Sequence, residues 1–261
     1  MTLAPAEQRL QELGVTDPSE IDLEAVAYDA GAAIRYRHLD GCEARIVGLQ
    51  DKAIITVNSS SLPRRQRFSI AHELGHWHHH RGRCLMCRVE EIQPRSPMSP
   101  ERTADGFAAD LLMPDYLFRP AALRLPRLDF TTLRSIADDF DVSITAAAIR
   151  VVEMDHHPAM LICHSPKGRK WFQRPKGIPE RWFPQQDLDA QSFAFGVQFG
   201  TDEEPRFPRK IGADAWFERS GADRFEIREQ TIRVGPDKTL TLLLLDEEML
   251  EDNGRSGWKP R

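Results

Sequence analysis

Apolar residues recur at intervals of three and four along several stretches of the first 157 residues, and this spacing predicts helices. Shorter apolar runs between them predict strands. The predicted helices cover Glu7–Leu13, Ile21 to near Gly31, Pro63–His80, Ser99–Met113 and two segments within Asp129–Met154. The predicted strands are Ala33–Arg37, Ala44–Leu49 and Ala53–Asn58, the last two joined as a β-hairpin around residues 50–52.

The pattern changes after Pro158, where strand-like runs replace helical ones. These runs are Met160–Cys163, Lys170–Gln173, Phe193–Phe199, Phe225–Val234 and Leu240–Leu245. A Gly-Pro-Asp turn at residues 235–237 joins the last two. The sequence therefore predicts an α+β protein with a β-rich C-terminal domain.

The segment from Asp129 to Met154 has the pattern of a helix-turn-helix, with its turn at residues 141–143. As a reader of DNA it is poorly equipped. The second helix carries one basic residue, Arg150, and the aspartates at 138, 139 and 141 would repel phosphates. Direct DNA binding is therefore disfavoured, and ordinary helix packing is the alternative.

Composition narrows the class of protein. Apolar residues make up 41% of 261 residues, enough for a core, while the formal net charge of −5 and the pI near 6.0 lack the basic footprint of nucleic-acid binders. The sequence contains no signal-peptide pattern and no apolar run of the ~20 residues that span a bilayer. We expect a cytoplasmic protein without a membrane partner, with reduced cysteines.

The chemistry is concentrated in His72-Glu73-Leu74-Gly75-His76, an H-E-x-x-H pattern. On a helix, residues four apart share one face, so His72 and His76 can aim both imidazoles at one metal ion. Glu73 lies about 100° further round, near enough to act on a metal-bound water as general base. Because five of the nine histidines lie within residues 72–80, a chance match is the competing explanation.

A catalytic zinc usually has three protein ligands, so a third must come from elsewhere in the chain. Glu101, in the first turn of the helix that Ser99-Pro100 starts, is the best candidate. An acid there is also explained by the helix dipole alone. A site of two imidazoles and one carboxylate suits a single divalent ion, with zinc first and manganese or iron as alternatives.

A lone Cys-x-x-Cys pair, Cys84 and Cys87, follows the histidine run. Two thiolates with nearby histidines could form a second, structural metal site. A redox switch at the catalytic metal and a loop with two incidental cysteines are the alternatives. Stabilisation of the oxyanion is equally open, with His80 and Tyr116 as candidates.

Two linked motifs resemble the ImmA/IrrE family of metallopeptidases: H-E-x-x-H, and Glu101-x-x-Ala-Asp105-x-Phe-Ala-x-x-Leu-Leu-Met-Pro114. The resemblance covers somewhat over half of the chain. Carried over residue by residue, it makes His72, His76 and Glu101 the metal ligands and Glu73 the general base. Asp105 stands where the family often has asparagine, so a contact between Asp105 and a ligand residue would be altered here.

The resemblance implies a zincin-like metallopeptidase domain over residues 1–128, with a small antiparallel sheet beside the H-E-x-x-H helix. A helix-turn-helix-like segment at 129–157 and a β-rich, sensory or regulatory domain at 158–261 would follow. It also implies a metalloendopeptidase that cleaves a helix-turn-helix repressor and so relieves repression. The alternative is a catalytically inactive module that regulates by docking a repressor or another partner.

Overall fold

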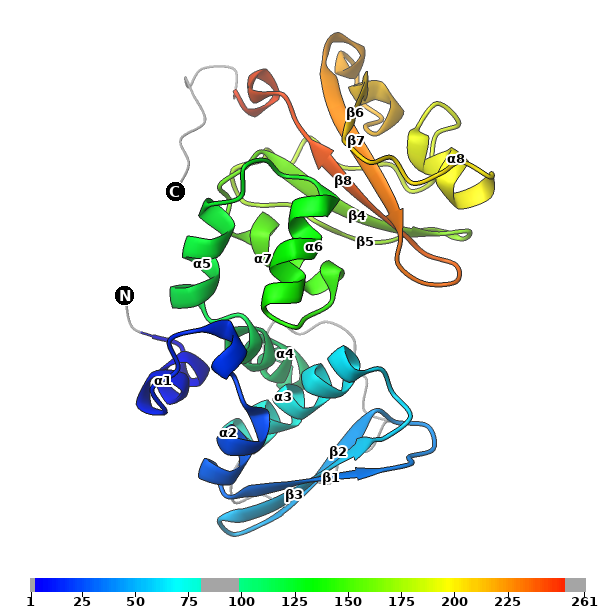
Figure 1. The fold of residues 1–261 in the computed structure, drawn as a ribbon. Coiled ribbons are helices and arrows are strands. Elements are labelled where there is room, and N and C mark those ends of the chain that lie inside the picture. The colour runs from blue at the N-terminus through cyan, green and yellow to red at the C-terminus, as the bar shows by residue number, and fades with distance from the viewer. Residues whose placement is uncertain (1–2, 81–98, 252–261) are drawn as a thin grey trace. The chain divides into compact units, whose positions relative to one another are not determined.

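The computed structural model describes residues 3–80 and 99–251, without the side chain of His80 (Figure 1). This part of the chain has a mixed α+β fold, as the sequence predicted. It divides into two compact units, one formed by residues 1–123 with 137–143 and the other by residues 124–136 with 144–261. No helix in the described ranges is both long and apolar enough to cross a membrane.

The first unit begins with two helices and a three-stranded sheet. Helices α1 (Pro5–Glu12) and α2 (Leu23–Asp29) precede strands β1 (Ala32–Arg37), β2 (Ala44–Leu49) and β3 (Lys52–Asn58). The predicted hairpin is confirmed, because β2 and β3 pair antiparallel. The prediction of a wholly antiparallel sheet is wrong: β1 pairs with β3 in parallel, giving the order β1-β3-β2. The segment from 38 to 51 serves as the crossover that a parallel pair requires.

Helix α3 (Pro63–His80) packs against β2 and β3 and carries the H-E-x-x-H pattern. The buried side chains of Ile46, Ile55 and Val57 line the inner sheet face. Trp77 is buried against Gly48, where an added Cβ would come within 2.3 Å of the indole ring. A glycine on β2 is therefore what lets the large indole settle on the sheet.

Helix α4 (Pro100–Leu112) lies alongside α3. Its start follows the predicted signals, because the Ser99 hydroxyl accepts a hydrogen bond from the backbone N–H of Arg102. The two helices come very close at Gly75, where a Cβ would lie 2.9 Å from the Cα of Ala104. The glycine inside the H-E-x-x-H pattern thus sets the spacing between the two helices of the predicted site.

Three more helices follow, α5 (Asp115–Leu123), α6 (Phe130–Asp139) and α7 (Ile144–Glu153). The helix, turn and helix predicted at 129–154 are present as α6 and α7, with Asp141 in the left-handed conformation at φ 48°. In the first unit Arg64 pairs with Asp138 at 2.7 Å and with Asp141 at 3.2 Å. Whether α6 and α7 act as a helix-turn-helix, and whether the 1–128, 129–157 and 158–261 division describes functional domains, stay predictions.

A five-stranded antiparallel sheet dominates the second unit, in the order β5-β4-β8-β7-β6. The strands are β4 (Ala159–Ser165), β5 (Gly168–Gln173), β6 (Arg209–Gly212), β7 (Glu226–Arg233) and β8 (Thr239–Leu244). Short 3-10 helices lie at Pro18–Glu20 in the first unit and at Ala213–Ala215, Ala222–Arg224 and Glu247–Leu250 in the second. Helix α7 packs against β4 and β5.

The strand predicted at Phe193–Phe199 is wrong, because these residues form helix α8 (Phe193–Phe199). Their aromatic content is typical of a strand. The helix start is instead fixed by capping: Ser192 accepts from the N–H of Phe195, and the buried carboxylate of Glu229 accepts from the N–H groups of Phe193 and Ala194. Tertiary contacts with a distant strand thus override the local strand preference.

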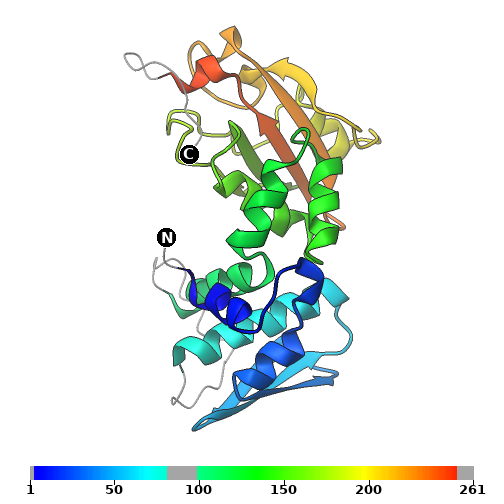
Figure 2. The same cartoon turned by 60° about the vertical axis from the view of Figure 1, so that its left-hand side comes forward.

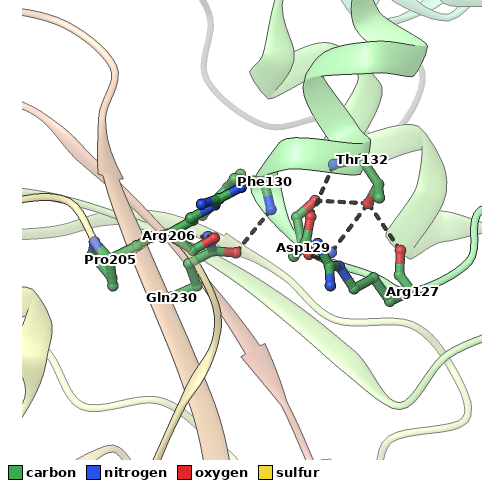
Figure 3. A network of polar contacts seen from close by, with 7 residues as sticks. All are labelled: Arg127, Asp129, Phe130, Thr132, Pro205, Arg206 and Gln230. Atoms are coloured by element: carbon green, nitrogen blue, oxygen red, sulfur yellow. Dashed lines mark hydrogen bonds and ion pairs between the residues drawn. The ribbon is translucent and has the colours of Figure 1, made fainter.

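One buried side chain, Gln230, fixes the start of α6 to the second unit (Figure 3). Its Oε1 accepts from the N–H of Phe130 at 2.8 Å, while its Nε2 donates to the carbonyls of Pro205 and Arg206, both at 3.0 Å. Asp129 pairs with Arg127 and accepts from the N–H of Thr132 at 2.9 Å. Both polar atoms of the Gln230 side-chain amide therefore form hydrogen bonds with backbone groups.

Candidate metal centre

The two histidines of the H-E-x-x-H pattern lie one turn apart on α3, as the predicted helix requires. Their Nε2 atoms are 3.0 Å apart, and the ring centroids are separated by 4.7 Å. The side chain of His76 is 4% exposed and that of His72 18%. Both imidazoles are therefore held by packing and present the same nitrogen atom to one point.

Glu101 reaches the same point from the first turn of α4. Its Oε2 lies 3.2 Å from Nε2 of His72, and its Oε1 lies 3.3 Å from Nε2 of His76. The three residues form a candidate metal-binding group, with one ligand atom from each within 4.8 Å of the others. The side chain of Glu101 is 57% exposed, which leaves an approach open from its side.

The spacing of these donor atoms fits a tetrahedral ion. Zinc binds histidine nitrogen and carboxylate oxygen at about 2.0–2.2 Å, so two ligand atoms on a tetrahedral ion lie roughly 3.3 Å apart. The observed separations are 3.0, 3.2 and 3.3 Å. Three ligands leave the fourth position of such an ion to water or substrate, as in catalytic sites. The same donors suit other divalent ions, so the geometry does not identify the metal.

Asp105 follows Glu101 by one turn of α4 and contacts the far side of the His72 ring. Its Oδ1 lies 2.9 Å from Nδ1 of His72. Burial disfavours the protonated imidazole, but the hydrogen bond to Asp105 and the nearby carboxylates outweigh it and raise the pKa of His72. Asp105 thus contacts His72, one of the predicted metal ligands. The effect of this contact on metal binding stays a prediction.

Glu73 directly follows the ligand candidate His72 in the sequence, and its side chain is buried. It is 5% exposed, and its Oε2 has no hydrogen-bond partner among the described residues. Burial, with added repulsion from Glu101, raises the pKa of Glu73 to about 7, although His72 opposes the shift. A carboxyl group in this environment can hold or release a proton near neutral pH, which is the property of a general base.

The remaining predicted residues are not brought to this point. The Tyr116 hydroxyl donates to the carbonyl of Val15 at 2.9 Å, which uses the proton that an oxyanion would need. Cys84, Cys87 and the side chain of His80 lie outside the described residues. A second metal site, a redox switch and the oxyanion role of His80 therefore stay predictions.

Gly75 is the site residue that reasoning from the sequence missed. Gly75 is one of the two unspecified positions of the H-E-x-x-H pattern, yet the close contact with Ala104 and Phe107 depends on it. The available signal was a glycine within a helix, which lowers helix stability and therefore needs a reason in packing.

Comparisons with known proteins find a family match that spans the candidate metal centre. Residues 28–152, just under half of the chain, match the family model Peptidase_M78, described as the IrrE N-terminal-like domain. Among solved structures, a Mycobacterium tuberculosis transcriptional regulator aligns over 92% of this chain and 74% of its own, with a TM-score of 0.57 and 15% identity. At that identity the likeness concerns the fold alone. No curated protein matches the sequence.

Proposed function

Because residues 28–152 belong to the family of IrrE N-terminal-like domains, we propose that this chain is a metal-dependent endopeptidase. One observation carries the proposal: His72, His76 and Glu101 converge at metal-ligand spacing. A buried carboxylate with an unpartnered oxygen, Glu73, follows the first of these ligands directly. Ligands without such a base would suit a structural ion equally well.

In this proposal the chain's own residues divide the work. His72, His76 and Glu101 hold the ion, which when bound supplies Lewis acidity toward a water and the scissile carbonyl. Glu73 takes the proton of the attacking water and later gives it to the leaving amine. Its raised pKa, about 7, suits both transfers.

Asp105 positions His72 by accepting a hydrogen bond from Nδ1, which leaves the lone pair of Nε2 for the metal. Tyr116 is a poor oxyanion donor while its hydroxyl is bonded to Val15. The exposed side of Glu101 is where an extended peptide would enter.

The proposed substrate is a helix-turn-helix repressor, whose cleavage would relieve repression. The resemblance of the paired motifs supports this choice, and the similar solved structure is described as a transcriptional regulator. This chain is itself poorly suited to reading DNA. Helix α7 packs on β4 and β5, and Glu153 is its one exposed residue. A negatively charged side chain there would repel phosphates.

The test is cleavage of purified helix-turn-helix repressors and of an unstructured peptide library by the metal-loaded protein, followed by mass spectrometry. We expect discrete cuts that disappear on chelation and in the Glu73→Gln variant. Stoichiometric metal and tight repressor binding without any cut would favour the alternative, a docking module. If the protein holds no metal after incubation with excess divalent ions, the peptidase proposal is wrong.

A further inference from the structure

In the described part of the chain, the three-stranded sheet of the first unit has one face covered by helices and one exposed face. Figures 1 and 2 both draw α2 and α3 on the same side of this sheet. Residues that alternate with the buried ones point to the other side, here called the outer sheet face. Its ten positions are Ala33, Arg35, Arg37, Arg45, Val47, Leu49, Lys52, Ile54, Thr56 and Asn58, of which Thr56 and Asn58 are half-buried and the rest are exposed.

An apolar row crosses this face at right angles to the strands. Ile54 on the central strand stands opposite Ala33 on one side and Val47 on the other. Val47 is 55% exposed and Ile54 36%, and Leu49, two residues beyond Val47, is 78% exposed. A sheet with one solvated face normally places polar residues there. Apolar side chains thus meet across all three strands, with branched ones on β2 and β3, and they indicate a contact surface.

Positive charge flanks the apolar row on both sides. The next row places Arg35 and Arg45 on either side of Thr56, and Lys52 lies beyond the row in the opposite direction. None of the ten positions is acidic, although the whole chain carries a net charge of −5. Within the described part of the chain, Arg35, Arg37, Arg45 and Lys52 make no ion pair. The local charge is thus opposite to that of the molecule and is not neutralised by neighbours.

We propose that the outer sheet face binds a short amphipathic helix with acidic flanks, supplied by a partner protein. Three strands spaced about 4.8 Å apart make the apolar row roughly 10 Å long, which matches two helical turns of about 5.4 Å each. Rows of one face are about 7 Å apart along the strands. A helix lying on the apolar row would therefore place acidic residues on either side within reach of Arg45 and Lys52.

Other classes of ligand fit this surface less well. Non-specific single-strand binders stack bases on aromatic rings, whereas the row here is aliphatic. A second copy meeting this face symmetrically would oppose four cations to four cations, which is repulsive. The inference is independent of peptidase activity, because the outer sheet face is the side of the sheet that does not pack on α3.

The test uses a designed helical peptide of about three turns, hydrocarbon-stapled, with Leu and Ile along one stripe and Glu on both flanks. Binding to the full-length protein is measured by fluorescence anisotropy and mapped by amide chemical shifts. We expect saturable binding that weakens with salt, with the largest shifts at Ile54, Val47 and Arg45. The same peptide with Lys in place of Glu should bind at least about tenfold more weakly.

Matched variants separate this surface from general charge effects. Arg35→Glu with Arg45→Glu should weaken binding of the acidic peptide about tenfold or more. Arg206→Glu with Arg224→Glu, an equal charge change at exposed positions of the second unit, should leave it unchanged. Thermal unfolding checks that both variants stay folded. Equal binding of the Lys-flanked peptide overturns the proposal, as does equal loss in both variants. No binding of the acidic peptide, or binding only of single-stranded DNA or phosphatidylserine vesicles, also overturns it.

Discussion

The carboxylate of Asp105 lies 2.9 Å from Nδ1 of His72, the ring nitrogen that does not face His76 and Glu101. A hydrogen bond there places the ring proton on Nδ1 and leaves the lone pair of Nε2 available to a metal ion. Helix α4 therefore contacts the imidazole of His72 at both nitrogens, through Asp105 at Nδ1 and Glu101 at Nε2.

Replacing Asp105 should weaken metal binding without removing a ligand. We expect Asp105→Ala to lower metal affinity by roughly 10–100-fold, since a histidine without its partner loses orientation and basicity. Asp105→Asn keeps an acceptor and should lose much less. Competition with a chromophoric chelator measures both constants, and equal affinities for Asp105→Ala and the wild type would show that the contact is merely structural.

Removing Glu101 should abolish the site. We expect Glu101→Ala to reduce the metal content to near zero, a larger effect than the roughly 10–100-fold loss caused by removing a ligand's supporting partner. Elemental analysis of dialysed protein measures the ratio of ions to chains. Glu153→Ala, an exposed acid on α7, serves as control and should keep full metal content. Full content in Glu101→Ala would mean that another residue provides the third ligand.

Glu73→Gln should separate metal binding from catalysis. The variant is expected to keep one ion per chain and to lose cleavage by roughly 10²–10⁴-fold, the range typical of a general base. Its folding stability should not fall, because the change removes a buried ionisable group with an unpartnered oxygen. Elemental analysis measures the metal content, a peptidase assay the cleavage rate and thermal unfolding the stability, all on the same preparation. Normal cleavage would contradict the assigned role.

Two glycines separate the effect of helix spacing from that of helix propensity. At Gly75 a Cβ would meet the Cα of Ala104 at 2.9 Å, so Gly75→Ala should cost about 1–3 kcal/mol and weaken metal binding by moving Glu101. At Gly106 a Cβ would meet nothing within 4 Å, so Gly106→Ala should stabilise α4 by about 0.5–1 kcal/mol. Urea unfolding and metal titration test both. Similar results for the two variants would refute the spacing argument.

His164 should make the second unit sensitive to mild acid. It is 1% exposed, both ring nitrogens lack a partner among the described residues, and burial with the nearby Arg169 lowers the pKa of His164 to about 4, against Asp187. As the pH falls, the unfolded state binds a proton at His164 before the folded state does. The contribution of neutral His164 to the free energy of unfolding is therefore complete above pH 6.5. It falls as the pH drops from 6.5 to 4, by up to about 3 kcal/mol.

Denaturant unfolding followed by tryptophan fluorescence measures this slope, and Trp216, whose ring lies 5.8 Å from that of His164, contributes to the signal. His164→Leu should flatten the stability profile between pH 6.5 and 4. An unchanged slope in that variant would assign the acid sensitivity to other groups.

Local signals in the sequence predicted the elements of the site well. The H-E-x-x-H spacing required a helix, and Ser99-Pro100 required a helix start, so α3 and α4 were predictable. The meeting of Glu101 with His72 was predicted only by the resemblance of the paired motifs, because composition alone could not distinguish a ligand from an acid favoured by the helix dipole. That meeting depends on a tertiary distance, set by the contact of Gly75 with Ala104.

The errors in the predicted fold have the same origin. A short apolar run predicted β1, but the pairing of β1 with β3 rather than β2 is a matter of topology. The run Phe193–Phe199 has strand-like composition, yet it is capped as a helix by Glu229, more than thirty residues away along the chain. Each error arises where a distant partner decides the outcome.

The pairing of Arg64 with Asp138 and Asp141 has a consequence for modularity. A fragment ending at Leu123 would contain the whole candidate metal centre yet leave Arg64 without either acid. Recombination that joined this peptidase-like unit to a different C-terminal half would therefore preserve these contacts only if the crossover lay beyond residue 141. The boundary that evolution could exploit lies further along the chain than the last residue of α5.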